Sequence, residues 1–149
     1  IVDRAFASYT TNTALSTSLP FDDTIPQNTE GTQILSASIT PKTTTNRVRV
    51  RFTAMFGTAN AGGGHCSAAF FLNSTVNAIH ATTAYVAATS VAASISEEWE
   101  FVPGATSAQT IAVRVGGNGF TMAVNGVDGS TRRFGGVAAA TLVLQEIVA

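Results

Sequence analysis

The sequence predicts an all-β domain, an antiparallel β-sandwich of jelly-roll type. Thr, Ser, Ala, Val and Gly dominate the chain, β-branched residues alternate with small polar ones, and turn signals recur at short intervals. Long amphipathic stretches rich in Leu, Glu and Lys are absent, so we expect few helices. A length of 149 residues fits one domain, and we assign residues 1–149 to a single β-sandwich.

About ten short strands are expected from this alternation. They fall at residues 5–10, 32–40, 47–57, 65–72, 76–81, 85–92, 94–102, 110–115, 120–124 and 142–148. The clearest is 47–57, where every second residue, from Val48 through Phe52 to Phe56, lies on the same face. The alanines of 85–92 would also suit a helix. Asn125–Gly126 is a strong two-residue hairpin signal, and we expect all of the apolar segment 142–148 in the core.

Charged residues make up only 11% of the chain, against about 25% in an average soluble domain. A monomer so poor in charge would expose much neutral surface, so we expect a homo-oligomer. The net charge of −1 provides no basic field for nucleic acid or an anionic membrane, and we expect neither partner. The single cysteine, Cys66, excludes an intrachain disulfide. We expect the chain to be the later part of a longer protein.

Two groups of charged residues alternate along separate predicted strands. Arg47, Arg49 and Arg51 share one strand face, and Glu98 and Glu100 share another. If the two strands are neighbours, these side chains form cross-strand pairs, either as a solvated ladder or as a charged stripe across a subunit contact. The glutamates also permit a glycosidase interpretation, because carboxylates two residues apart on a strand lie about 7 Å from each other. A true catalytic pair usually spans a cleft, so we favour the ladder.

The remaining candidates for chemistry give no catalytic or metal motif. His65, Cys66 and His80 lack metal-ligand spacing, and we predict no metal, no cofactor and no catalytic residue. No nucleophile elbow and no glycine-lysine phosphate loop occurs. Four aromatic side chains could stack on a sugar: Tyr9, Tyr85, Trp99 and Phe120. Trp99 shares a face with Ile95 and Phe101, which favours core packing for it.

Two stretches of the chain resemble a known family. One is Asp22-Asp23-Thr24-Ile25-Pro26-Gln27-Asn28-Thr29-Glu30-Gly31, which leads to Thr40-Pro41-Lys42. The other runs from Asn125-Gly126 through Phe134-Gly135-Gly136-Val137-Ala138 to Leu142-Val143-Leu144-Gln145-Glu146-Ile147. Both are similar to the C-terminal domains of phage and prophage tail-fibre-like proteins.

The resemblance implies a homotrimeric β-rich head at the distal end of a fibre, with a jelly roll like that of tumour-necrosis-factor-like domains. It also implies a place on the virion surface, synthesis in the cytoplasm of a bacterial host, and contact with other virion proteins through an upstream part. Four phenylalanines are candidates for either the core or the threefold contact: Phe52, Phe56, Phe70 and Phe71.

Our leading hypothesis is therefore a non-enzymatic head that binds a host cell-surface glycan or protein, with a saccharide as the default. Loops carry specificity in such scaffolds. The candidate ligand residues are Gly64, His65, Asn118, Asn125, Asp128, Arg132 and Arg133. The first alternative is a purely structural virion component, such as a head fibre, a capsid decoration or a fibre-assembly module. The second is a glycan-cleaving enzyme that uses Glu98 and Glu100.

Overall fold

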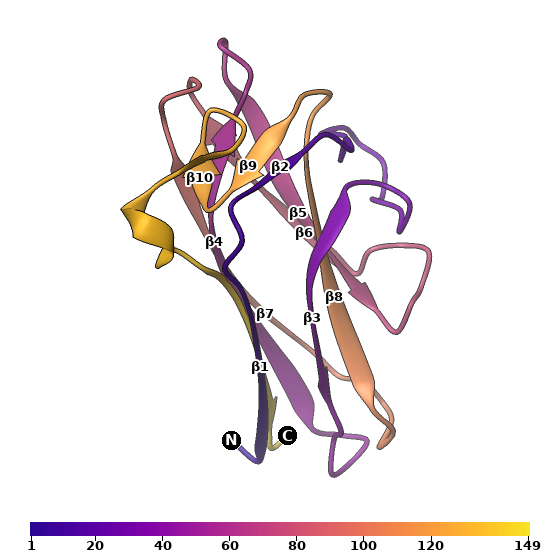
Figure 1. The fold of residues 1–149 in the computed structure, drawn as a ribbon. Coiled ribbons are helices and arrows are strands. Elements are labelled where there is room, and N and C mark those ends of the chain that lie inside the picture. Colours follow the sequence, from indigo (N-terminus) through magenta and orange to yellow (C-terminus); the bar gives the residue numbers. More distant parts are fainter.

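The computed structural model describes residues 1–149 and is all-β, with curled antiparallel sheets and no α-helix (Figure 1). The strands are β1 (Asp3–Tyr9), β2 (Thr13–Leu15), β3 (Thr32–Ile39), β4 (Arg47–Thr58), β5 (Gly64–Leu72), β6 (His80–Val86), β7 (Ala93–Phe101), β8 (Gln109–Gly117), β9 (Met122–Val124), β10 (Gly126–Val127), β11 (Thr131–Arg132) and β12 (Ala140–Ile147). A short 3₁₀ helix, η1 (Phe134–Gly136), precedes β12. None of the helical structure has the length and hydropathy that a membrane crossing requires.

Two sheets face each other across the core (Figure 1). The first has the order β1-β12-β4-β9-β2, with β7 on the other side of β4. The second has the order β3-β8-β5-β6, and β10 and β11 form a separate hairpin. The two chain ends lie side by side at one end of the molecule, where the Val2 N–H donates to the Glu146 carbonyl at 2.8 Å.

The long strands pair in a nested pattern, because strands at equal distance from the middle of the chain are neighbours. β5 pairs with β6, β4 with β7, β3 with β8, and β1 with β12, all antiparallel. The chain therefore folds back on itself as one long double strand, which is then rolled so that its successive pairs alternate between the two sheets.

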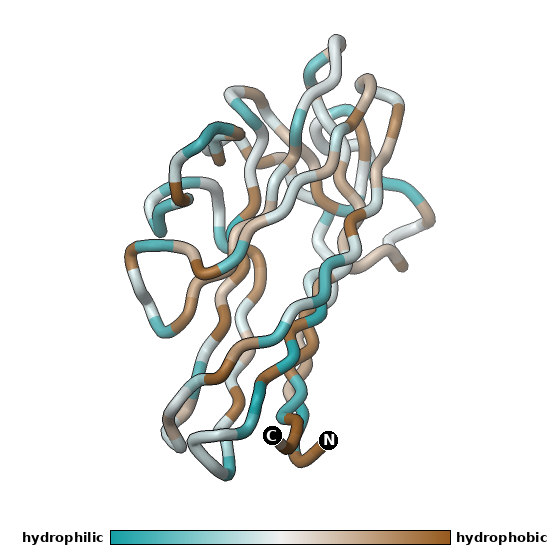
Figure 2. The backbone as a smooth tube through the Cα atoms, turned by 180° about the vertical axis from the view of Figure 1, so that it is seen from behind, coloured by the Kyte–Doolittle hydropathy of each residue, from teal (hydrophilic) through white to brown (hydrophobic).

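The core forms between the inward faces of the two sheets. Along β4 the inward residues Val48, Val50, Phe52, Ala54 and Phe56 are all buried, as the alternation predicts. Phe52 meets Phe70 of the opposite sheet edge to face, with ring centroids 5.5 Å apart. Figure 2 shows the same alternation as hydrophobic and hydrophilic segments that follow each other along the strands. Each fully buried phenylalanine contributes about 1.5–3 kcal/mol of transfer free energy to folding.

A second, smaller core lies on the outer face of the second sheet. Leu19, from the loop after β2, packs there on Ala69 and Phe71 of β5, with Ala78 and Ala112 around them. β5 is thus covered on both faces, so every residue from Cys66 to Phe71 is buried instead of every second one. Phe52, Phe56, Phe70 and Phe71, which the sequence could not assign to either the core or a subunit contact, are all buried within one chain.

Three expectations about the elements are wrong. The segments 76–81 and 85–92 are not two strands; one strand, β6, covers His80–Val86, and residues 87–92 form a loop. Asn125–Gly126 is not a hairpin turn, because β9 and β10 on either side of it do not pair with each other. The strands number twelve, since β2, β10 and β11 are too short to leave a visible alternation.

β12 lies inside the first sheet, between β1 and β4. Its inward residues Leu142, Leu144 and Glu146 are fully buried, whereas Val143 is only partly covered and Val148 is exposed. The expectation that all of 142–148 is core is therefore wrong for the outward half, because a strand buries every second residue when one of its faces meets solvent.

Glu146 is a buried acidic side chain that ties the loop before β4 to the last strand. Its Oε1 accepts hydrogen bonds from the Lys42 backbone N–H at 2.6 Å and from Asn46 Nδ2 at 2.7 Å. Its Oε2 has no partner within the chain. The carboxyl group therefore satisfies two donors of the 41–46 loop, next to the chain ends.

Replacing Glu146 with alanine should lower the free energy of unfolding by about 2–4 kcal/mol, because it leaves the Lys42 N–H and the Asn46 amide without their acceptor. Urea denaturation measures the change. Gln145→Ala, the adjacent outward position, is the control and should stay within about 0.5 kcal/mol of the original protein. Equal stability of the two variants would show that this hydrogen-bonded cluster is dispensable.

Candidate functional site

Three aromatic rings stack at the end of the molecule that lies away from the chain ends. The Phe21 ring lies on the His65 ring, with centroids 3.8 Å apart and an interplanar angle of 19°. His65 meets Tyr85 edge to face at 5.2 Å. His65 on β5 and Tyr85 on β6 are cross-strand neighbours, so the sheet register brings them together. Phe21 is 50% exposed and Tyr85 is 57% exposed, so both present ring surface to solvent.

The loop after β2 holds Phe21 over the sheet. The Leu19 N–H donates to the Gly117 carbonyl at 3.1 Å, and the Phe21 N–H donates to Asn118 Oδ1 at 3.2 Å. Gly116 permits this close approach, because a Cβ there would lie 2.7 Å from the Leu19 nitrogen. The Asn118 N–H in turn donates to the His65 carbonyl at 3.1 Å, so Asn118 links the loop to β5.

A groove of about 390 Å³ adjoins the stack, between the 19–26 loop and strands β5 and β6. Its polar side chains are Asp22, Thr24, Ser67, Thr82 and Thr83, and its apolar side chains include Phe21 and Pro26. Ser67 donates to Thr83 Oγ1 at 3.0 Å, and Thr83 donates to the Cys66 carbonyl at 3.3 Å. An open aromatic face beside hydroxyl and carboxyl groups suits a ligand that has both apolar faces and hydroxyl groups.

A second hollow of about 320 Å³ lies on the other side of the same loop, next to His80. His80 Nε2 is 2.7 Å from Glu97 Oε1, and the imidazole stacks on Trp99 at 4.8 Å. This pair joins the edge strands β6 and β7 of the two sheets. His80 and Trp99 are thus packing residues, as the sequence predicts for Trp99. By contrast, His65 Nδ1 is buried and has no hydrogen-bond partner.

The candidate ligand residues from the sequence separate into three groups. Gly64, His65 and Asn118 lie at the aromatic stack, and Gly64 leaves room for the Phe120 ring, which a Cβ would meet at 2.3 Å. Asp128, Arg132 and Arg133 are exposed on or beside the β10–β11 hairpin.

Asn125 is only 2% exposed, and its Nδ2 donates to the Tyr9 carbonyl at 2.9 Å and the Thr11 carbonyl at 3.1 Å. The expectation of a surface contact at Asn125 is therefore wrong. The residue takes a positive φ of 61°, which asparagine tolerates, and its amide caps the end of β1.

Sequence reasoning missed Phe21, Asp22 and Thr83 as site residues. The 20–31 loop was interpreted only through its turn chemistry. A phenylalanine in a loop otherwise made of proline, aspartate and threonine was the available signal, because a large apolar side chain needs a reason to stay in such a loop. No signal in the sequence pairs Tyr85 with His65, since this depends on the strand register.

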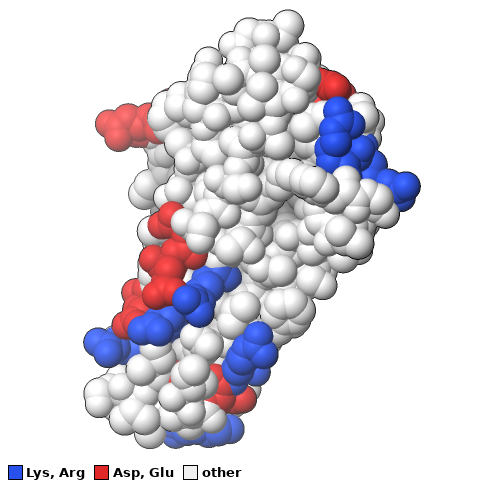
Figure 3. Space-filling model, turned by 90° about the vertical axis from the view of Figure 1, so that its left-hand side faces the viewer, with Lys and Arg blue, Asp and Glu red and all other residues white.

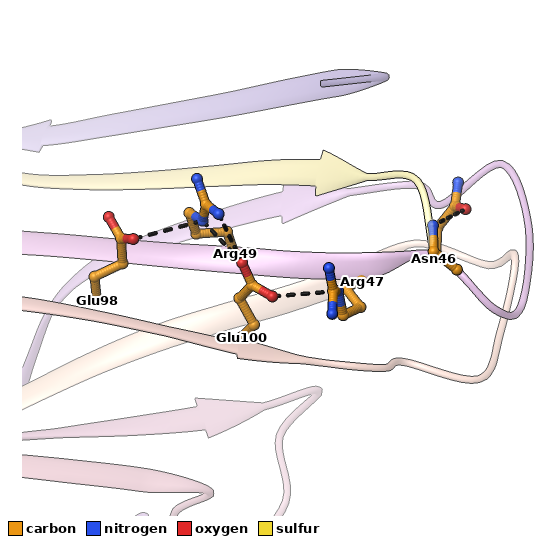
Figure 4. Close-up of polar contacts among 6 residues, drawn as sticks. Asn46, Arg47, Arg49, Glu98 and Glu100 are labelled. Carbon is orange, nitrogen blue, oxygen red and sulfur yellow. Dashed lines mark hydrogen bonds and ion pairs between the residues drawn. The ribbon is translucent and has the colours of Figure 1, made fainter.

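The predicted charge ladder forms on the outer face of the first sheet (Figures 3 and 4). Arg49 Nη2 lies 2.8 Å from Glu100 Oε1, and Arg51 Nε lies 2.5 Å from Glu98 Oε2. Arg47 Nε is 3.2 Å from Glu100 Oε2, and Arg49 Nε is 3.5 Å from Glu98 Oε1. Both glutamates therefore point at arginines on an open sheet face. Such exposed pairs contribute about 0–1 kcal/mol each.

No group of three or more His, Cys, Asp or Glu side chains comes together to hold a metal ion. Cys66 is buried in the main core, with Sγ 3.7 Å from the Gly57 carbonyl oxygen. Burial raises the pKa of the Cys66 thiol to about 12. The protonated thiol is a poor nucleophile and metal ligand, so Cys66 acts as a small apolar residue.

Comparisons with known proteins give no sequence relative. No protein-family model matches the chain, and no curated protein matches it. Among solved structures, one match is dimeric latent PorU from Porphyromonas gingivalis, with 8% identity, a TM-score of 0.46, and coverage of 99% of this chain and 13% of that chain. Another is the infectious bursal disease virus VP2 subviral particle, with 12% identity, a TM-score of 0.43, and coverage of 99% and 38%.

A third match is the enzymatically active domain of bacteriophage CBA120 tailspike protein 4, with 12% identity, a TM-score of 0.34, and coverage of 97% of this chain and 19% of that chain. Distant structural neighbours thus include viral and phage proteins. This chain spans well under half the length of each of these three chains. At such identities and TM-scores, the likenesses assign neither a family nor a function.

The raised pKa of Cys66 predicts a loss of stability at alkaline pH. Below pH 9 the thiol is protonated in both the folded and the unfolded chain. As pH rises from 9 toward 12, the unfolded chain releases this proton and the folded chain keeps it. The free energy of unfolding therefore falls, by up to about 1.4 kcal/mol per pH unit from this group.

Chemical denaturation across this pH range, with Cys66→Ala for comparison, measures the effect. The alanine variant should lose less stability per pH unit, because every other titrating group is the same in both proteins. Identical slopes would show that the thiol ionises as readily in the folded protein as in the unfolded chain.

Proposed function

We propose that this chain is a virion-surface domain of a bacterial virus, a homotrimeric fibre head that binds a host-surface saccharide without cleaving it. The observation that carries the proposal is the exposed stack of Phe21, His65 and Tyr85 beside a groove of hydroxyl and carboxyl groups. Sugar rings have apolar faces that pack on aromatic rings and hydroxyl groups that need polar partners. The groove has both within one ligand-sized space.

The resemblance of residues 22–31 and 125–147 to tail-fibre-like C-terminal domains supports the viral setting. The nested strand pairing supports a jelly roll of the tumour-necrosis-factor-like type, since a double strand rolled into two facing sheets is the plan of that fold. Binding at one site would be weak, and three copies in each fibre would strengthen it through avidity. The receptor groove would then be repeated on each subunit.

A purely structural virion role is the second candidate. The observation that favours it is the number of large hydrophobic side chains on the surface, including Phe6, Phe134 and Val137. Such surface suits contact with other protein chains. A glycan-cleaving role has less support, because Glu98 and Glu100 lie on one open face and point at arginines.

A glycan array probed with the isolated domain tests the proposal, followed by titration of the best binder. Phe21→Ala and Tyr85→Ala should each weaken binding about tenfold, because each removes about 1.4 kcal/mol of ring contact. Phe6→Ala is the matched control, since Phe6 is 54% exposed on β1, in the other sheet. Its affinity should not change.

If the array shows no binding to any bacterial surface polysaccharide, this result would contradict saccharide binding and favour the structural role. Equal loss of binding in all three variants would show that the aromatic stack is not the site. Turnover of a bound glycan that disappears in the combined Glu98→Gln and Glu100→Gln variant would establish the enzymatic alternative.

A further inference from the structure

An exposed basic and apolar patch surrounds η1. We define the basic patch as Arg132, Arg133, Phe134 and Val137. Phe134 is 72% exposed and Val137 is 84% exposed, so the patch offers large apolar side chains to solvent. Neither arginine forms an ion pair, and Asp128 on the same hairpin pairs with neither. In Figure 3, cationic atoms gather both at the ladder and at a separate place nearer the β10–β11 end.

The backbone holds Phe134 outward at a conformational cost. Phe134 has a φ of 55°, and Gly135 and Gly136 follow with φ of 64° and 96°. A phenylalanine rarely adopts a left-handed conformation, and such strain concentrates at binding surfaces. Beneath this turn lies a hollow of about 450 Å³, lined largely by uncharged side chains such as Met55, Ala138 and Ala139. The patch thus combines unpaired positive charge, exposed apolar groups and a largely apolar hollow.

An acidic and apolar patch lies on the other face of the molecule. We define the acidic patch as Asp22, Asp23, Ile25, Val76 and Ile79. Its two segments are held together by hydrogen bonds from the Asn28 N–H to the Val76 carbonyl and from the Ala78 N–H to the Pro26 carbonyl, both 2.9 Å. All three of its apolar side chains are exposed.

Neither aspartate of the acidic patch pairs with a cation, and Asp22 Oδ1 accepts only from Thr24 within the loop. The acidic patch therefore has the same makeup as the basic patch, with charge of the opposite sign. Each has two unpaired charges of one sign beside exposed apolar side chains. Of the other 13 acidic and basic side chains, six are paired within the chain, at the ladder and at the His80–Glu97 pair.

The two patches lie on opposite faces of the sandwich. The basic patch adjoins the outer face of β4 and β7, whereas the acidic patch covers the sheet that contains β5 and β6 (Figure 1). A twofold contact through either patch would place like charges against each other. A head-to-tail contact instead places the arginines of one copy against the aspartates of the next.

We propose that the basic patch of one copy of this chain docks on the acidic patch of a neighbouring copy. Arg132 and Arg133 then meet Asp22 and Asp23, and the exposed apolar side chains of the two patches cover each other. The contact adds a specific interface to the proposed function. It rests on only one part of that function, the self-association of the chain. Asp22 belongs to both the acidic patch and the saccharide groove, so the contact covers one edge of the groove. The exposed face of Tyr85 lies outside both patches.

Charge reversal tests the contact by mass measurement in solution. The original chain should have a mass of at least two chains, with 15.3 kDa for each chain. The double variants R132E/R133E and D22K/D23K should each dissociate to single chains, because each places like charges together. The variant that combines all four substitutions should reassociate, since the charges are exchanged and the complementarity is kept. R4E/K42E has the same charge change as R132E/R133E outside the patches, and it should associate like the original chain.

Circular dichroism checks that each variant is folded, and Phe134→Ala, which keeps all charges, should weaken association as well. Two results would show that the chain associates through another surface. In the first, the original chain associates and both charge reversals leave its mass unchanged. In the second, the combined variant stays dissociated and Phe134→Ala has no effect. If the original chain has a mass of 15.3 kDa at micromolar concentration, both the contact and the trimer fail. Saccharide binding by the folded R132E/R133E variant is read separately, so a failure of the receptor role is distinguished from a failure of the contact.

Discussion

Backbone pairing to β4 is the constraint on which the rest of the structure depends. β12 and β9 follow each other along one edge of β4, and β7 covers the other edge. The inward row of β4 fills the centre of the core, and its outward row carries the arginines of the ladder. The pairing with β7 brings Glu98 and Glu100 opposite those arginines. The pairing with β12 places Glu146 against the loop that leads into β4. One strand thus sets the core, the ladder and the junction of the chain ends.

The candidate groove depends on a different feature, the second core outside β5. Leu19 is buried against Ala69 and Phe71, and this anchor holds the following loop over the sheet. Because that loop is fixed, Phe21 lies on His65 and the loop forms the second wall of the groove. The same loop carries Asp22 and Asp23 outward. The packing of one leucine therefore positions both the proposed saccharide groove and the proposed acidic contact surface.

Alternation along a strand is local, so the sequence predicts β3, β4, β7 and β8 closely, together with the inward row of β4 and the possibility of the ladder. It fails where strands are very short, as for β10 and β11, whereas the predicted strand 65–72 matches β5 even though β5 does not alternate. It also misplaces β6, because alanine and threonine fit strand and loop equally well. His65 and Asn118 were reachable as loop-end residues. Tyr85 was also named as a possible sugar-stacking residue. The contacts of Phe21 and Tyr85 with His65 could not be predicted, because only the register and the second core bring these rings together.

The central claim is that the groove beside Phe21, His65 and Tyr85 is a saccharide site. Backbone-amide NMR of the isotopically labelled domain, titrated with glucose, galactose and N-acetylglucosamine at millimolar concentrations, tests it most directly. The account predicts saturable shifts for at least one sugar at Ser67, Thr82, Thr83 and Tyr85, with the Arg132–Phe134 turn unaffected. Shifts confined to that turn or to the ladder, or no saturable shift with any of the three sugars, would contradict it.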